Sequence, residues 1–460
     1  MTLALALLVP WTAAAITALL DGRRAWVGWT AAAALAATVA ITAVLAGGAY
    51  GDAPETTVAG GWPAGIGIEL RADSLGVLFA LLSNGVLLAA LCYQVAVGIR
   101  SRLYPALVLF LAAGLTGLFL TADVFNFYVF FELSMIAAYA LAVYGDEARQ
   151  LSAGFIFAVV NLLGSFLFLI GVAALYHVTG TLEMDTVAER LNAVEPSATI
   201  LIAVAIFVAF GVKLGLFPFH FWLPTVYASA TPAVAAMLSG AVANIGSYGL
   251  LRFGAGMMSA ELRLGATVLI AIGTLSIVYG ALQAISRRTS AEVLAYSAIG
   301  QAGYVLIALG IGGPVGFAAA IVYAVINSLN KALLFLVTEI RGWLVAGAFA
   351  IGAFSVAGLP PTAGFFGKVE LFRAGISEDS VALVALIFLG GALSFVYMFQ
   401  IYQHDFWSSQ RRTGAESPLG LRAVAAALAL VVLVLGLWPE PMLWASREAA
   451  AVLLTTGSTP

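Results

Sequence analysis

The chain has 460 residues, of which 62% are hydrophobic and 9% charged, with a formal net charge of −3 and a mean hydropathy of +1.05. A soluble domain is about half apolar and about a quarter charged, so this composition excludes a soluble globular protein and predicts many membrane crossings. The sparse charges form no basic patch for nucleic acid, and one cysteine, Cys92, with three scattered histidines indicates neither disulfides nor a metal or iron–sulfur centre.

A membrane-spanning helix needs about 20 mostly apolar residues. The first apolar run has no basic residues before it, which disfavours a cleaved signal peptide and predicts a first helix that starts outside. About fourteen segments meet the length rule, and they make an all-α polytopic membrane protein: 3–20, 26–46, 74–97, 103–121, 124–144, 153–178, 198–220, 232–253, 264–284, 293–312, 315–339, 343–374, 381–404 and 420–438.

Three segments outside these spans have patterns of their own. Residues 47–74 are rich in glycine and alternate in polarity, which predicts a small β-hairpin on the outer side. Residues 180–197 have a helical charge pattern and predict a surface helix. The tail over 440–460 begins with a short amphipathic helix, which we expect to lie along the membrane surface.

The arginines favour one orientation in the membrane. With fourteen crossings that start outside, eleven arginines fall in cytoplasmic loops and six fall in outer loops or the tail. Cytoplasmic loops carry an excess of basic residues in membrane proteins. We therefore expect a multi-pass protein of the cell (cytoplasmic or inner) membrane, with residues 1–460 in one membrane domain and both termini outside.

All three lysines of the chain, Lys213, Lys331 and Lys368, lie inside long apolar stretches, and Glu132 is the matching acid. The cost of a charged side chain in hydrocarbon is estimated at about 3 to more than about 10 kcal/mol, and such residues usually mark an ion path. One acid and three bases along a membrane protein therefore predict a proton relay.

The seventh and twelfth predicted helices contain breaks close to two of these lysines. Pro218 lacks an N–H and follows Lys213 by five residues, and Gly358, Pro360 and Pro361 come shortly before Lys368. Irregular backbone at membrane depth is tolerated only where protein or water satisfies it. Broken helices beside buried charges are typical of transporter sites.

Five stretches in order carry a resemblance to a known family. The chain resembles the antiporter-like family shared by Mrp-type multisubunit Na+/H+ antiporters and the membrane arm of respiratory complex I, and the likeness covers about residues 70–405. Its length, lack of a long C-terminal extension and DVFNFYVFFE look most like the D-subunit branch of the Mrp-type group. The matching stretches are DVFNFYVFFELSMIAAY (123–139), VKLGLFPFHFWLPTVYASATPAVAAMLSG (212–240), AEVLAYSAIGQAGYVLIALG (291–310), NSLNKALLFLVTE (327–339) and AGLPPTAGFFGKVELF (357–372).

This resemblance implies roles for the buried charges. Glu132 falls on the glutamate of the FE motif and Lys213 on the lysine of VKxxxFPxxxWLP, which form a coupled pair in the family. Lys331 and Lys368 fall on the lysines of KALLF and GFxGK and continue a hydrophilic axis. The implied activity is proton translocation in a monovalent cation (Na+)/proton antiporter, with other membrane subunits as partners, protons and Na+ as transported ions, and no cofactor.

The chain departs from the family pattern at two polar positions. Asn244 stands in ANIGSYGLLR where the family usually has a lysine, and Asn327 replaces a common histidine before KALLF. Asparagine hydrogen-bonds water but does not titrate. The relay therefore runs through water at Asn244 or is interrupted there.

Several further residues are candidates for the proton path. His220 follows Lys213 by about two turns and is positioned to pass protons toward the cytoplasm, although an interfacial histidine that bonds backbone is an equal alternative. Asn244, Ser297 and Tyr304, together with Tyr248, are candidates to hold water. Asp123 precedes a helical run and predicts an N-cap.

Each buried charge also has a structural alternative. Glu132 can hold helices together by a hydrogen bond, Lys331 can bind backbone carbonyls of a neighbouring helix, and Lys368 can snorkel or pair locally near Glu370.

At the level of function, the alternatives are a proton-pumping subunit of a complex I-type NADH:quinone oxidoreductase, a non-conducting scaffold, and the membrane partner of a cytosolic inorganic-carbon enzyme. No nucleotide loop or nucleophile elbow supports a stand-alone enzyme.

Overall fold

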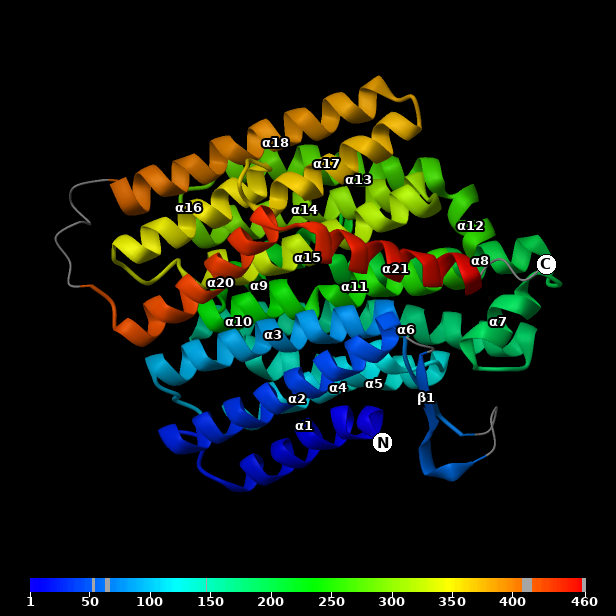
Figure 1. The fold of residues 1–460 in the computed structure, drawn as a ribbon, viewed down its shortest axis with the longest axis horizontal. Helices are drawn as coiled ribbons and strands as arrows, with labels where there is room; N and C mark the ends of the chain where they lie inside the picture. Colours follow the sequence, from blue (N-terminus) through cyan, green and yellow to red (C-terminus); the bar gives the residue numbers. More distant parts are fainter. Residues whose placement is uncertain (52–53, 63–66, 146, 408–415, 457–460) are drawn as a thin grey trace.

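The computed structural model describes residues 1–51, 54–62, 67–145, 147–407 and 416–456. It is a bundle of long helices whose axes are roughly parallel to one another (Figure 1). The first half contains α1 Thr2–Leu19, α2 Ala25–Gly51, α3 Ser74–Val97, α4 Tyr104–Leu120, α5 Val124–Ala142, α6 Ala148–Thr179, α7 Met184–Leu191, α8 Pro196–Leu214, α9 Trp222–Ser229, α10 Pro232–Met237 and α11 Asn244–Gly249. The second half contains α12 Ser259–Leu264, α13 Ala266–Ser286, α14 Ser290–Ile311, α15 Gly313–Leu336, α16 Trp343–Ala357, α17 Ala363–Ser377, α18 Val381–Tyr402, α20 Leu419–Leu437 and α21 Glu440–Thr456. Shorter helical turns are η1 Ala59–Gly61, η2 Phe219–Phe221, η3 Leu238–Val242, η4 Leu250–Met257 and η5 Gln403–Trp407.

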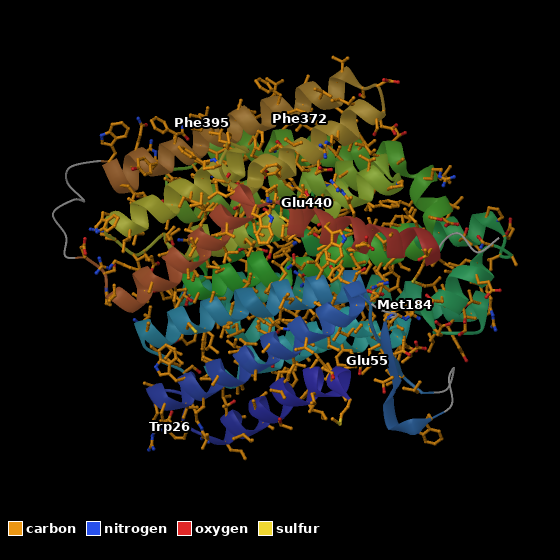
Figure 2. The ribbon with its side chains drawn as sticks, in the orientation of Figure 1. Trp26, Glu55, Met184, Phe372, Phe395 and Glu440 are labelled. Carbon is orange, nitrogen blue, oxygen red and sulfur yellow. The ribbon has the colours of Figure 1, made fainter. Side chains whose placement is uncertain are left out.

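The helices confirm an all-α polytopic membrane protein. Among the described residues, twelve helical segments are at least 18 residues long and apolar enough to cross a membrane. Two shorter apolar helices, α4 and α16, lie at the fourth and twelfth predicted segments. Trp26 at the start of α2 and Glu55 on the hairpin mark opposite ends of the bundle (Figure 2). The start of α1 and the end of α21 lie at the same end (Figure 1).

Both small elements that the sequence predicts at this end are present. Strands β1 Glu55–Val58 and β2 Glu69–Ala72 pair antiparallel, with Glu55 opposite Ala72. Helix α7 follows in the second predicted segment, and Glu183 caps it by accepting hydrogen bonds from the N–H groups of Asp185 and Thr186. The hairpin and α7 lie together at the right end of Figure 1.

The tail helix differs from the expectation of a helix along the membrane surface. Helix α21 packs against α15 and α3 and runs along the bundle after a turn that follows α20 (Figure 1). Its side chains Ser446, Ala449, Ala450 and Leu453 are buried. The small residues on this face let α21 pack closely against the bundle. The amphipathic pattern of the sequence did not predict this packed position.

Helices end near both positions where the sequence predicts breaks, and at the first of them a side chain binds a backbone carbonyl. Helix α8 ends at Leu214, Gly215 adopts a positive φ of 64°, and the indole of Trp222 donates to the carbonyl of Val212 at 3.0 Å. Helix α16 ends before Gly358, whose φ is 84°, and α17 begins at Ala363. Left-handed glycines at these positions end the helices without a Cβ clash.

Glycines also bring α13 and α14 into close contact. A Cβ on Gly280 would lie 2.6 Å from the backbone nitrogen of Gly300, and one on Gly273 would lie 2.8 Å from the carbonyl oxygen of Gly303. The abundance of glycine predicts such contacts, because small residues let helices approach closely in lipid. This contact fixes α14, which carries several polar side chains of the candidate site.

Candidate functional site

Glu132 and Lys213 occupy adjacent levels of the same helix interface. The hydroxyl of Ser165 on α6 donates to the carboxylate of Glu132 on α5. The ammonium of buried Lys213 on α8 contacts the sulfur of Met135 and donates to the side-chain oxygen of Asn161 at 3.4 Å. Asn161 and Ser165 are four residues apart on α6, so the acid and the base bind neighbouring turns of one helix, about 6 Å apart along it.

The two groups are close but do not form an ion pair in this structure. Among the described residues, no salt bridge joins Glu132 to Lys213. The ammonium instead lies 5.5 Å from the ring centres of both Phe131 and Phe157, which is within the range of a cation–π contact. Lys213 therefore contacts aromatic rings and Asn161 instead of the Glu132 carboxylate.

Asn244 connects three segments of the core. Its amide donates to the hydroxyl of Ser83 on α3 at 3.0 Å, to the carbonyl of Gly240 on η3 at 3.0 Å and to the hydroxyl of Ser328 on α15 at 3.3 Å. Asn244 itself lies on α11, between the π-helical turns η3 and η4. Such turns are rare and often occur at functional sites. The sequence-predicted position is thus a buried polar junction.

Lys331 lies on α15 one turn beyond Ser328 and is completely buried. Its ammonium donates to the hydroxyl of Ser297 at 2.7 Å and to the carbonyl of Leu294 at 3.3 Å, both on α14. The structure therefore joins two residues that the sequence analysis selected separately, Lys331 and Ser297. The contact with the Leu294 carbonyl is also consistent with the alternative that Lys331 has a structural role and links α15 to α14.

Lys368 on α17 has a different environment. Its ammonium lies 3.2 Å from the ring centre of Tyr304 and 5.1 Å from that of Tyr323. The Lys368 nitrogen and the Tyr304 hydroxyl are both buried, and neither has a hydrogen-bond partner among the described residues. Glu370 pairs with Arg373 at 2.5 Å. Local pairing of Lys368 with Glu370 is therefore not observed.

A hydrogen-bonded network that the sequence analysis missed extends from Lys331 toward Lys368. The hydroxyl of Tyr397 on α18 bonds Ser297 at 3.0 Å, and the amide of Gln301 on α14 donates to Tyr397 at 3.1 Å. The hydroxyl of Tyr323 donates to the other end of the Gln301 amide, and the Tyr323 ring lies against Lys368. The one available signal was the four-residue spacing of Ser297 and Gln301, which puts both on one helix face.

His220 lies in the break after α8 and is separate from this network. Its ring is 4.3 Å from the ring of Tyr279 and stacks on Phe217 at 5.5 Å. Its Nδ1 is buried and has no hydrogen-bond partner among the described residues. The contacts of His220 do not connect it to Lys213, so its part in proton transfer stays a prediction.

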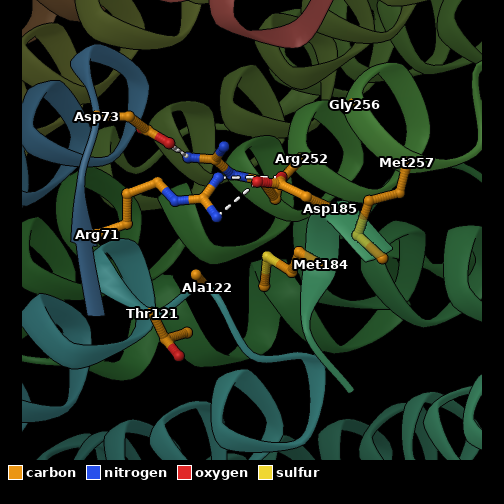
Figure 3. A pocket seen from close by; sticks show the side chains of 9 residues that line it. All are labelled: Arg71, Asp73, Thr121, Ala122, Met184, Asp185, Arg252, Gly256 and Met257. Carbon is orange, nitrogen blue, oxygen red and sulfur yellow. Dashed lines mark hydrogen bonds and ion pairs between the residues drawn. The ribbon is translucent and has the colours of Figure 1, made fainter. Parts of the chain in front are cut away.

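A cluster of charges at the hairpin end of the bundle was also missed. Arg252 on η4 pairs with Asp73, the N-cap of α3, at 2.7 Å and donates to the hydroxyl of Tyr248 at 3.0 Å. Arg71 on β2 pairs with Asp185 on α7 at 2.7 Å. These residues surround a very small cavity (Figure 3). The cluster fastens the hairpin and α7 to the bundle.

Asp123 and Asp73 both lie at helix starts, but their pKa values are shifted in opposite directions. Asp123 caps α5 by accepting the N–H of Asn126 at 2.6 Å, as predicted. Burial raises the pKa of Asp123, and the backbone N–H bonds only partly oppose this. Burial would also raise the pKa of Asp73, but the Arg252 guanidinium and the N–H of Gly76 lower it below its usual range. Asp73 is therefore held as a carboxylate.

Comparisons with known proteins find relatives over most of the chain. The family described as "NADH:quinone oxidoreductase/Mrp antiporter, TM" matches residues 121–343 and 341–394. The D subunit of a Na(+)/H(+) antiporter from Alkalihalophilus pseudofirmus is 32% identical over 86% of this chain and 85% of its own length.

Two solved structures share the fold, with nearly equal TM-scores. A chain in the Mrp complex from Dietzia sp. DQ12-45-1b superposes with a TM-score of 0.90 and 26% identity, covering 99% of this chain and 98% of that chain. A chain in an archaeal respiratory membrane complex, the membrane-bound sulfane sulfur reductase, gives 0.89 and 27%, covering 98% and 97%.

Proposed function

Because this chain belongs to the membrane family shared by NADH:quinone oxidoreductase and Mrp antiporters, we propose that it is the proton-translocating subunit of a multisubunit monovalent cation (Na+)/proton antiporter. The observation that carries this proposal is a set of charged side chains inside the helix bundle: the partly buried Glu132 on α5 and the buried lysines Lys213, Lys331 and Lys368 on α8, α15 and α17. Buried lysines without acidic partners are costly in a membrane protein, and a transport role accounts for their presence.

The series alternates between direct contacts and short gaps. Direct hydrogen bonds join Glu132 to Ser165, Lys213 to Asn161, and Lys331 to Ser297. One helical turn separates the first contact from the second. Several buried oxygen and nitrogen atoms near the series have no protein partner among the described residues, namely Asn84 Oδ1, Asn327 Oδ1, Asn330 Oδ1, Tyr304 OH and Lys368 Nζ. Such atoms are the hydrogen-bonding sites that a path through water requires.

The Glu132–Lys213 interface supplies a physical switch in this proposal. A carboxylate close to an ammonium favours the charged form of each group. A change in their separation would therefore couple a motion of α5 or α8 to uptake or release of a proton. The break after Leu214 allows α8 to move, because no continuous helix ties it to α9.

Two alternatives have observations in their favour. The neutral Asn244 favours a non-conducting scaffold, because it cannot take up a proton where the family usually has a lysine. The likeness to a chain of the sulfane sulfur reductase complex favours a redox-driven proton pump. Purification of the native complex distinguishes a redox-driven pump from an antiporter, because redox subunits would copurify with the chain only if it belongs to a redox-driven pump.

Cation-driven proton movement in proteoliposomes tests the proposal. The complete complex would be reconstituted with Glu132→Gln, which keeps the size of the side chain, or with Glu195→Gln, a matched change at the exposed start of α8. We expect the first variant to lose the Na+-induced pH change while the second retains it. Normal exchange by Glu132→Gln in an intact complex would contradict the relay and support the scaffold.

A further inference from the structure

A cavity of about 300 Å³ lies at the opposite end of the bundle from the hairpin. Arg23 from the α1–α2 turn and Arg100 from the α3–α4 loop line it, near the end that Trp26 marks in Figure 2. Its walls include Tyr104 and Leu107 of α4 and Leu141 of α5. The arginine bias assigns this end to the cytoplasm.

Hydrogen bonds hold the loops around this cavity in place. The N–H of Gly22 donates to the carbonyl of Arg102 at 3.0 Å, and the Arg102 guanidinium donates to the carbonyl of Leu19 at 3.2 Å. The N–H of Arg100 donates to the hydroxyl of Tyr144, at the end of α5, at 2.9 Å. The α1–α2 turn, the α3–α4 loop and the end of α5 are therefore tied to one another, and the two arginines stand on a fixed frame.

Two solvent-exposed arginines give the cavity positive charge that is not paired within the part of the chain that the structure describes. Neither the Arg23 nor the Arg100 guanidinium has an ion pair or hydrogen bond among the described residues, whereas Arg71, Arg252 and Arg422 all pair with acids. Asp21 accepts only the backbone N–H of Arg23, at 3.2 Å. Two unpaired guanidinium groups on one cavity leave their donors available to an anion.

A buried donor in the wall of the cavity is also unsatisfied. Tyr104 is 0% exposed, and its hydroxyl has no hydrogen-bond partner among the described residues. Its ring packs against Tyr144 with 4.4 Å between centres, which fixes the direction of the side chain. Buried hydroxyl groups almost always have a partner, so this one indicates a ligand or water that accepts its hydrogen.

We propose that this cavity binds a phosphate group, either in the head group of an anionic phospholipid or as free phosphate. Guanidinium groups match phosphate oxygens in geometry and charge, and the Tyr104 hydroxyl adds a neutral donor. Basic pockets at the cytoplasmic ends of transmembrane helices are typical of lipid head-group sites. Leu107, Ala140 and Leu141 form an apolar wall beside the arginines, where the first carbons of an acyl chain can pack.

Native mass spectrometry of the purified full-length chain tests the site without reference to transport. Short-chain phosphatidylglycerol, short-chain phosphatidylcholine and inorganic phosphate would be titrated separately. Arg23→Gln/Arg100→Gln removes both guanidinium groups, and Tyr104→Phe removes the hydroxyl but keeps the ring contact. Arg24→Gln/Arg288→Gln is the control, because it removes the same charge from two equally exposed arginines that do not line the cavity.

We expect phosphatidylglycerol to bind the native chain, with an affinity that falls at least about tenfold in the Arg23/Arg100 variant and about fivefold in Tyr104→Phe. The control should change affinity by less than about twofold, and phosphatidylcholine should bind more weakly. If phosphatidylglycerol binds and inorganic phosphate does not, the ligand is the lipid head group. If inorganic phosphate also binds and is weakened equally by the substitutions, the cavity is a general phosphate site. No binding of either anion, or equal losses in the control and the Arg23/Arg100 variant, would overturn the proposal.

Discussion

Replacing Arg252 with methionine would leave the carboxylate of Asp73 buried without its ion-pair partner. The two side chains are 8% and 4% exposed, and their charged atoms are 2.7 Å apart. Removing one member of a buried pair costs about 3–5 kcal/mol, because the other charge is stranded. We therefore expect Arg252→Met to lower the free energy of unfolding by about that amount.

A double-mutant cycle separates the stranded charge from lost packing. Asp73→Asn keeps an oxygen that can accept the N–H of Gly76, now bonded at 2.8 Å, so the cap of α3 is retained. Arg252→Met combined with Asp73→Asn leaves no unpaired charge. The double variant should therefore be destabilised by clearly less than the sum of the single variants.

Unfolding in mixed detergent micelles, followed by the fluorescence of the nine tryptophans, measures these changes. Arg422→Met is the control, because the carboxylate that it leaves without a partner, Glu416, is 51% exposed. We expect that control to cost no more than about 1 kcal/mol. An equal cost for Arg252→Met and Arg422→Met would refute the reasoning from burial.

The lowered pKa of Asp73 also fixes the sign of a pH effect in the same assay. Because its pKa is lower in the folded state, the stabilisation is complete above the unfolded value of about 4 and is lost as the pH falls through the folded value. The stability difference between the native chain and Asp73→Asn should therefore shrink on acidification below about pH 4. A difference that stays constant across that range would contradict this assignment.

Three further variants test other parts of the structure. Tyr397→Phe removes the hydroxyl that continues the network from Lys331, and proton transport should fall by more than about tenfold with normal assembly; unchanged transport would exclude this route. Asp123→Asn keeps the cap but removes a carboxyl group whose pKa is raised by burial. The free energy of unfolding of this variant, compared with that of the native chain, should therefore be more favourable at pH 8 than at pH 4. A difference that is the same at both pH values would contradict this. Gly364→Ala places a Cβ in steric overlap with the carbonyl oxygen of Ser355, so the variant should lose its monodisperse peak in size-exclusion chromatography. A normal peak would contradict the expected clash between α17 and the end of α16.

The helices and their breaks were predictable because they depend on local chemistry. Runs of about 20 apolar residues predict spans, and a proline or left-handed glycine inside such a run predicts an interruption. The burial of Lys213 and Lys331 followed from the same runs. The hairpin over 55–72 was predictable from alternating polarity, because one of its faces packs on the bundle.

The contacts between distant segments were not predictable from local patterns. Ser297 and Tyr397 are 100 positions apart, and Asp73 and Arg252 are 179 apart, so only the tertiary fold reveals that they meet. Nor did the charges of Glu132 and Lys213 predict that serine and asparagine side chains of α6 would hold them on separate turns. The packed position of α21 depends likewise on the faces of α3 and α15.

The most direct test of the relay is Na+-induced pH change in everted membrane vesicles from antiporter-deficient cells that express the complete operon. The native chain would be compared with Lys213→Ala, with assembly of the complex measured in the same membranes. The proposed relay predicts that the variant assembles normally and loses the pH change. An assembled Lys213→Ala complex with undiminished exchange would contradict proton transfer through this subunit.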